Sequence, residues 1–88
     1  MDSSAKKYFN LGITAHQKGN LKEAEEFYRQ ALQSDPKHAD ANHNLGVLGL
    51  STGQHDAAIP FFMTAIGANP EEAQYWVSCL TALLNVKK

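Results

Sequence analysis

Residues 9–12 read FNLG and residues 43–46 read HNLG, so the tripeptide Asn-Leu-Gly occurs twice in a short chain. The repetition extends well beyond these letters. When residues 5–38 are aligned with residues 39–72, nine positions are identical and several others exchange similar side chains. Internal repetition with a period of about 20–50 residues is typical of proteins that stack one small structural unit. The sequence therefore predicts two similar units, followed by the beginning of a third.

Each unit contains signals for the end of one helix and the start of the next. Gly19 and Gly53 follow apolar-periodic stretches, at places where a left-handed residue commonly ends a helix. The Asp-Pro pair at 35–36 and the Asn-Pro pair at 69–70 are typical of a capping side chain followed by a first-turn proline. Glu72 stands where the carboxylate of a capping box belongs. These signals predict a helix–turn–helix in each unit.

The pattern predicts an all-α fold, because no stretch alternates as a strand does. The expected helices cover residues 4–17, 21–34, 37–51, 55–67 and 71–86. Small residues such as Gly12 and Gly46 should let paired helices approach closely, since interiors pack large side chains against small ones. Leu11 and Leu45 are expected to point inward beside them.

These residues resemble the tetratricopeptide repeat, whose signature is W-x2-L-G-x2-Y…A-x3-F…P over about 34 residues. The matching positions are Tyr8, Leu11, Gly12, Ala24, Tyr28, Ala31 and Pro36, and then Leu45, Gly46, Ala58, Phe62, Ala65 and Pro70. Asn42 departs from the first aromatic position of the second unit. In the third unit Trp76 fits, but Cys79 and Leu80 replace the Leu-Gly pair.

The resemblance implies a solenoid of about five helices in right-handed superhelical stacking. Residues 1–88 would form a single domain, with repeat one at 5–38, repeat two at 39–72 and a terminal helix at 73–86. In this family the first helix of each unit lines a concave surface that binds a peptide or protein segment. The residues expected to line it are Phe9, Asn10, Ile13, His16, Gln17, His43, Asn44, Val47, Leu50 and Ser51.

Asn10 and Asn44 occupy the same place in successive units. An asparagine carboxamide offers both a donor and an acceptor, which is what an extended peptide backbone requires. The pair resembles the asparagine ladder in the tetratricopeptide superhelix of O-linked N-acetylglucosamine transferase and related bacterial proteins. Ser78 interrupts this ladder in the third unit. The alternative interpretation is that both asparagines are simply polar residues on an exposed helix surface.

The terminal helix is unusually apolar for the end of a solenoid, where a polar outer surface is expected. The residues expected to mediate self-association are Trp76, Val77, Leu80, Leu83 and Leu84. Either this surface joins another copy, giving a homo-oligomer, or missing downstream repeats of a longer protein cover it. A hydrophobic cap tolerated by a monomer is the third alternative.

Composition and charge argue against several classes of function. The net charge is −1, which gives no basic footprint for nucleic acid, and no apolar run approaches the length that crosses a membrane. The single cysteine, Cys79, favours a reducing compartment, so a cytoplasmic location is expected. No catalytic motif, cofactor motif or metal site is recognised. The four histidines lack the i,i+4 spacing of a helical zinc site and are expected to be exposed and polar.

The sequence therefore predicts a non-catalytic interaction module without a cofactor. A second interpretation is an N-terminal substrate-capture segment of a larger bacterial enzyme that resembles a glycosyltransferase or sulfotransferase. A third is an oligomerisation element that binds only copies of itself.

Overall fold

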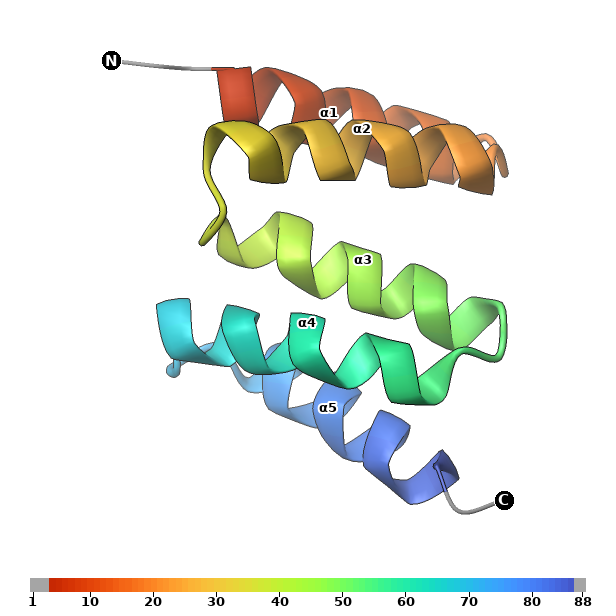
Figure 1. The fold of residues 1–88 in the computed structure, drawn as a ribbon, viewed down its shortest axis with the longest axis vertical. Helices are drawn as coiled ribbons and strands as arrows, with labels where there is room; N and C mark the ends of the chain where they lie inside the picture. The colour runs from red at the N-terminus through yellow and green to blue at the C-terminus, as the bar shows by residue number, and fades with distance from the viewer. Residues whose placement is uncertain (1–3, 87–88) are drawn as a thin grey trace.

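The computed structural model describes residues 4–86, which form five α-helices joined by short turns (Figure 1). The helices are α1 (Ser4–Gln17), α2 (Leu21–Ser34), α3 (Ala39–Ser51), α4 (His55–Ala68) and α5 (Ala73–Asn85). This part of the chain contains no strand, so the predicted all-α class is confirmed.

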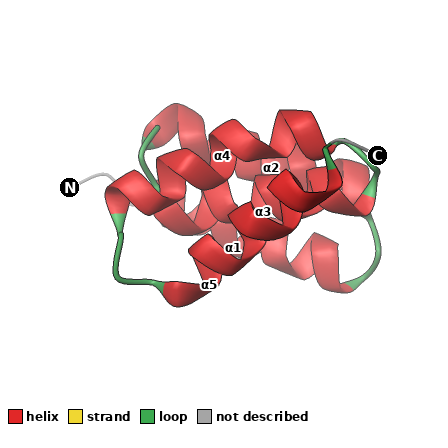
Figure 2. Ribbon diagram, turned by 90° about the horizontal axis from the view of Figure 1, so that it is seen from below, coloured by secondary structure: helices red, strands yellow, loops and turns green. Residues whose placement is uncertain are grey.

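The helices form two hairpins and a terminal helix. α1 packs on α2, α3 packs on α4, and α5 packs on α4 while also contacting α3. Contacts between α2 and α3 join the two hairpins. Figure 2 shows α2 and α4 on one side of the stack and α1, α3 and α5 on the other. We call these the second-helix layer and the first-helix layer. The first-helix layer brings the corresponding helices of successive repeats to one side of the molecule.

Gly19 and Gly53 end α1 and α3 as predicted. Their φ angles are +81° and +80°, in the left-handed region that favours glycine. The next amide in each case closes a loop back to the helix: Asn20 N–H donates to the Ala15 carbonyl at 2.9 Å, and Gln54 N–H donates at 2.7 Å to the carbonyl five residues earlier. This is the bonding pattern of a glycine-based helix stop.

The predicted helix starts at the two proline pairs are wrong. α3 and α5 each begin two residues later than expected, and Pro36 and Pro70 lie in turns. The physical reason is that His38 N–H donates to the Asp35 carbonyl at 3.0 Å, which makes Asp-Pro the opening of a β-turn. Glu72 N–H donates to the Asn69 carbonyl at 3.3 Å in the same way.

The caps also differ from the prediction. The N-cap of α3 is His38, whose Nδ1 accepts the Ala41 N–H at 3.1 Å. Asp35 instead accepts the Lys37 N–H at 3.2 Å, inside the turn. Glu72 is the N-cap residue of α5 and its side chain makes no capping hydrogen bond, so the predicted capping box is absent.

Close packing at glycine holds each hairpin together. An ideal Cβ on Gly46 would stand 2.7 Å from Cζ of Phe62, and one on Gly12 would stand 3.2 Å from Cζ of Tyr28, with other ring atoms closer still. Both rings are fully buried. The prediction that small residues permit this approach is confirmed.

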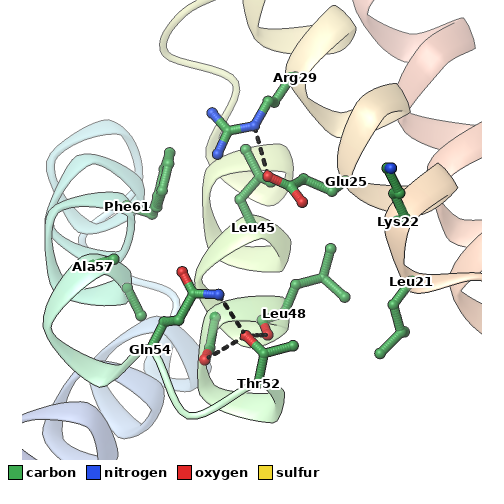
Figure 3. A pocket seen from close by; sticks show the side chains of 12 residues that line it. Leu21, Lys22, Glu25, Arg29, Leu45, Leu48, Thr52, Gln54, Ala57 and Phe61 are labelled. Carbon is green, nitrogen blue, oxygen red and sulfur yellow. Dashed lines mark hydrogen bonds and ion pairs between the residues drawn. The ribbon is translucent and has the colours of Figure 1, made fainter.

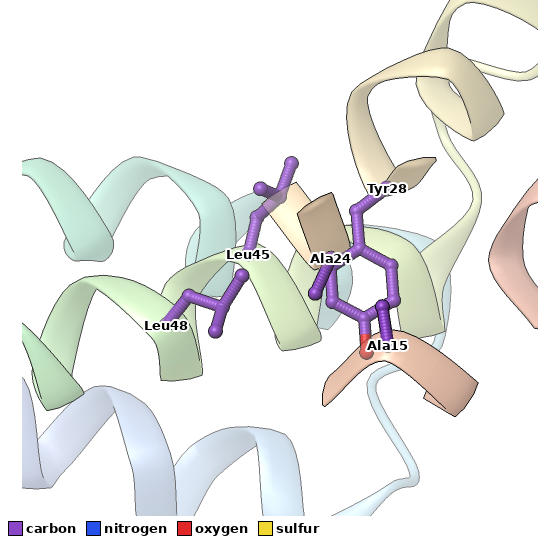
Figure 4. Packing of buried hydrophobic residues seen from close by; sticks show 5 residues of the cluster. All are labelled: Ala15, Ala24, Tyr28, Leu45 and Leu48. Carbon is purple, nitrogen blue, oxygen red and sulfur yellow. The ribbon is translucent and has the colours of Figure 1, made fainter. Parts of the chain in front are cut away.

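The principal core lies between the two hairpins. Its buried residues are Ala15, Ala24, Tyr28, Leu45 and Leu48 (Figure 4). Leu45 is 4% exposed because α2 covers it, whereas Leu11, predicted to point inward, is 38% exposed. Leu11 occupies the place of Leu45 in the first repeat, and no described helix precedes α1 to cover it. The inward prediction for Leu11 is therefore wrong.

Candidate functional site

The ten predicted ligand-binding residues all lie on α1 and α3, in the first-helix layer. None of them is fully buried. Asn10, Gln17 and Ser51 are exposed. The half-buried ones are Phe9, Ile13, His16, His43, Asn44, Val47 and Leu50.

The apolar members of this set also contribute to the core. Phe9 and Ile13 pack against the principal core, while Val47 and Leu50 pack against a second cluster that joins α4 and α5. The ring of Phe9 lies 4.9 Å from that of His38, between centroids. These side chains are therefore fixed by packing and present only part of their surface to solvent.

A tyrosine hydroxyl joins three helices beside this surface. The Tyr28 hydroxyl on α2 lies 3.2 Å from His16 Nδ1 on α1 and accepts the Asn44 Nδ2–H from α3 at 3.3 Å. Burial raises the pKa of Tyr28 and the hydrogen bond with Asn44 opposes that rise, so the hydroxyl is protonated at neutral pH. The sequence assigned Tyr28 only to packing. The sequence did contain a signal for this hydroxyl: the equivalent position in the second repeat is Phe62, so packing alone does not require a tyrosine.

The two asparagines of the predicted ladder differ in their surroundings. Asn10 is exposed, and within residues 4–86 its side chain makes no hydrogen bond. Asn44 is half-buried and uses one amide N–H on Tyr28. Asn10 therefore presents its whole carboxamide to solvent, while Asn44 presents part of it.

His43 is held by contacts from α4 of its own repeat and from α5 of the next. Its Nε2 lies 2.8 Å from the Ser78 hydroxyl oxygen, and its ring centroid lies 4.9 Å from that of Tyr75 and 5.5 Å from that of Phe62. Ser78, which interrupts the asparagine pattern, is 6% exposed and faces His43. The third unit therefore uses this position to attach α5 to α3.

Burial dominates the titration of His43. It lowers the pKa of the imidazole, while the hydrogen bond with Asn44 and the negative charges of Asp40 and Glu72 act in the opposite direction. The neutral ring is thus the favoured form near pH 7.

A second polar contact attaches α5 to α3. The Tyr75 hydroxyl donates a hydrogen bond to Oδ1 of Asp40, and the Tyr75 side chain is 4% exposed. Burial, reinforced by the hydrogen bond and charge of Asp40, raises the pKa of Tyr75 well above its usual range. The tyrosine therefore remains a hydrogen-bond donor at any physiological pH.

The residues predicted to mediate self-association lie on α5 and are open to solvent. Their exposed fractions are 49% for Trp76, 53% for Val77, 57% for Leu80, 50% for Leu83 and 73% for Leu84. The Trp76 Nε1–H donates to the Pro70 carbonyl at 2.8 Å, which fixes the indole against the preceding turn.

A pocket beside α2 was not expected from the sequence (Figure 3). Its volume is about 250 Å³, and it lies between α2, α3 and α4. Leu45, Leu48 and Phe61 are among its apolar residues. Glu25 and Arg29 form an ion pair of 3.0 Å at its edge, and the Arg29 guanidinium lies 5.8 Å from the centroid of Phe61. None of the ten predicted ligand-binding residues lines it.

Residues 4–86 contain no group of three histidine, cysteine or acidic side chains placed to hold a metal ion. The four histidines, expected to be exposed, are each half-buried, because they pack beside aromatic rings or at helix ends. Cys79 is a buried thiol. In the same part of the chain, none of the helices combines the length and apolar character needed to traverse a bilayer.

Comparison with known proteins agrees with the architecture. A family model described as tetratricopeptide repeat matches residues 15–83. Human "Tetratricopeptide repeat protein 16" is 39% identical over 77 residues, covering 80% of this chain and 9% of that protein. "Photosystem I assembly protein Ycf3" of Prochlorococcus marinus is 29% identical over 76 residues, covering 83% of this chain and 42% of that protein.

A solved structure of MamA superposes with a TM-score of 0.88 at 26% identity, covering 94% of this chain and 45% of that one. The chain thus spans less than half the length of each of these relatives. The family model agrees with the repeat period and with the paired helices of the structure. This chain belongs to the tetratricopeptide repeat family, whose fold serves protein–protein interaction.

Proposed function

We propose that the first-helix layer binds an extended peptide or protein segment, and that the single domain of residues 1–88 has no catalytic activity or cofactor of its own. The observation that carries this proposal is the recurrence of Asn10 and Asn44 at equivalent positions on the surface of α1 and α3. Asn10 is exposed and makes no hydrogen bond within the described residues. Such a carboxamide can donate to a peptide carbonyl and accept from a peptide N–H.

The neighbouring side chains suit a mixed ligand. Ile13, Val47 and Leu50 are partly exposed and are already held in place by the core. Contact with an apolar ligand side chain would therefore cost little additional side-chain entropy. Gln17 and Ser51 extend the polar edge of the surface at the ends of α1 and α3. The proposed ligand is therefore an extended segment that carries both apolar side chains and a free backbone for hydrogen bonding.

Two asparagines contribute limited affinity. A net hydrogen bond stabilises a complex by about 0.5–1.5 kcal/mol. The proposed binding is accordingly weak or moderate and depends on several contacts together. The same proposal includes a cytoplasmic location. Cys79 is a buried free thiol, and free thiols are typical of proteins in reducing compartments.

The proposal is tested with peptides selected from a random display library on the unaltered chain. The variant carrying Asn10→Ala and Asn44→Ala should bind the selected peptide about 5- to 150-fold more weakly, as expected for two lost hydrogen bonds of about 0.5–1.5 kcal/mol each. The matched control carries Asn20→Ala and Asn69→Ala, which alter two exposed asparagines in turns. Equal affinities for the two variants would remove the asparagines from the binding site.

A further inference from the structure

The seam at which the first helix of each repeat meets its partner is built from small residues. Gly12 and Gly46 leave room for the rings of Tyr28 and Phe62 because glycine has no Cβ atom. Three residues later, a Cβ on Gly49 would lie 3.3 Å from the Cβ of Ala58. The second helix of each hairpin packs as it does because this seam has almost no side chains.

α5 has large side chains at the same places. In the repeat alignment Leu80 takes the position of Gly46, and Leu83 takes the position of Gly49. Trp76 precedes them on the same strip, four residues before Leu80. A helix packed on α5 in the manner of α4 on α3 would place an aromatic ring where the Leu80 side chain begins. The element that covers α5 is therefore not a regular second helix of this family.

The spacing of these side chains suits a different kind of helix pairing. Trp76, Leu80 and Leu83 are separated by four and then three residues, which is the spacing of the apolar seam in a coiled coil. In such a seam the large side chains of one helix fill spaces between large side chains of the other. A suitable partner is therefore a helix with a similar strip of large apolar side chains, and α5 of a second copy has this strip.

We propose that α5 pairs in antiparallel orientation with α5 of a second copy of this chain, about a two-fold axis near Leu80. A two-fold interface uses the same patch on both molecules, so a self-complementary apolar seam is what it needs. No Asp, Glu, Lys or Arg occurs within Ala73–Asn85, so no like charges on the two helices oppose their approach.

The area and the flanking charges support this partner and this orientation. The five exposed apolar side chains of α5 are each between 49% and 73% exposed, and covering them on two copies would approach the roughly 1,000 Å² that a specific interface requires. Glu71 and Glu72 immediately precede α5. Antiparallel pairing separates the two acidic residues of one copy from those of the other, whereas parallel pairing sets these like charges together.

This association is independent of ligand binding on α1 and α3, and its test does not involve a peptide. Light scattering on the purified chain, over a wide range of protein concentrations, should give twice the mass of one chain. Leu80→Glu should give a monomer with an unchanged circular dichroism spectrum, since the side chain it replaces is 57% exposed. The control Met63→Glu, at an apolar residue of α4 that is 61% exposed, should remain dimeric.

A cross-linking experiment tests the orientation and does not depend on how Leu80→Glu folds. With Leu80→Cys, oxidation should join two copies, because the residue lies at the centre of the seam. With Ala73→Cys it should not, because antiparallel pairing separates the two copies of residue 73. A monomer at every concentration, or a dimer that survives Leu80→Glu, would overturn the pairing. Cross-links at residue 73 would overturn the antiparallel arrangement.

Discussion

Gly46 lies so close to Phe62 that the smallest possible side chain, a single Cβ, would come within 2.7 Å of the ring carbon Cζ. This separation is well below the roughly 3.5–4.0 Å of carbon–carbon contact. The same relation holds in the first repeat, between Gly12 and Tyr28. It fixes how the two helices of each hairpin pack, and through them how the first helices of successive repeats come to share one layer.

The variant Gly46→Ala should therefore lose stability although alanine is the better helix former. Overpacking against the Phe62 ring should lower the free energy of unfolding by about 1–3 kcal/mol. Gly67→Ala is the matched control, because a Cβ at Gly67 meets nothing within 4 Å. It should be neutral or stabilising by up to about 1 kcal/mol. Urea unfolding of the two variants measures the difference, and equal values would contradict the packing described here.

The attachment of α5 to α3 should depend on the hydrogen bond from Tyr75 to Asp40. Tyr75→Phe keeps the ring and removes the donor, so α5 should be released more often, at a loss of about 1 kcal/mol. Hydrogen exchange should become faster in the amides of α5 than in those of α1. Tyr8→Phe is the control, because Tyr8 stacks on Phe27 and its hydroxyl donates to none of the described residues. Equal exchange in both variants would show that the hydroxyl contributes nothing to the attachment.

Stability should fall on mild acidification because of His43. Its pKa is lowered in the folded chain, so the unfolded chain takes up the proton first as the pH decreases. The contribution of His43 is fully present above about pH 6.5, the ordinary pKa of histidine, and is lost as the pH falls through the lower folded value. His43→Gln should flatten the dependence of unfolding free energy on pH in this range. An unchanged slope would show that the burial of His43 does not govern it.

The contribution of the Tyr28 hydroxyl can be separated from that of its ring. Tyr28→Phe should fit without steric change, because Phe62 occupies the equivalent place in the second repeat. The loss of contacts with His16 and Asn44 should lower the free energy of unfolding by about 1 kcal/mol. Thermal unfolding measures it. A loss as large as that of Tyr28→Ala would mean that the phenylalanine ring does not occupy the tyrosine site.

The repeat itself could be predicted from the sequence, because its determinants are local. Gly19 and Gly53 are needed wherever a helix ends in a left-handed residue, and Gly12 and Gly46 wherever a ring crosses a helix. The proline pairs were ambiguous, since Asp-Pro suits both a helix start and a β-turn. The turn hydrogen bonds decided between them.

Other parts of the site depend on contacts between repeats, and local sequence patterns do not predict such contacts. The partners of His43 and Tyr75 lie 35 residues away in the chain, at Ser78 and Asp40. Their meeting requires the relative placement of α3 and α5. The exposure of Leu11 likewise follows from its neighbours in space, since the same signature residue is buried as Leu45.

Binding of an extended segment is proposed on the surface of α1 and α3. Nuclear magnetic resonance titration of the ¹⁵N-labelled chain with a selected peptide tests it most directly. The side-chain amide signals of Asn10 and Asn44 should shift together with backbone signals around Ile13 and Val47, while α2 and α4 change little. Shifts confined to the pocket between α2 and α4, with both asparagine amides unmoved, would contradict it.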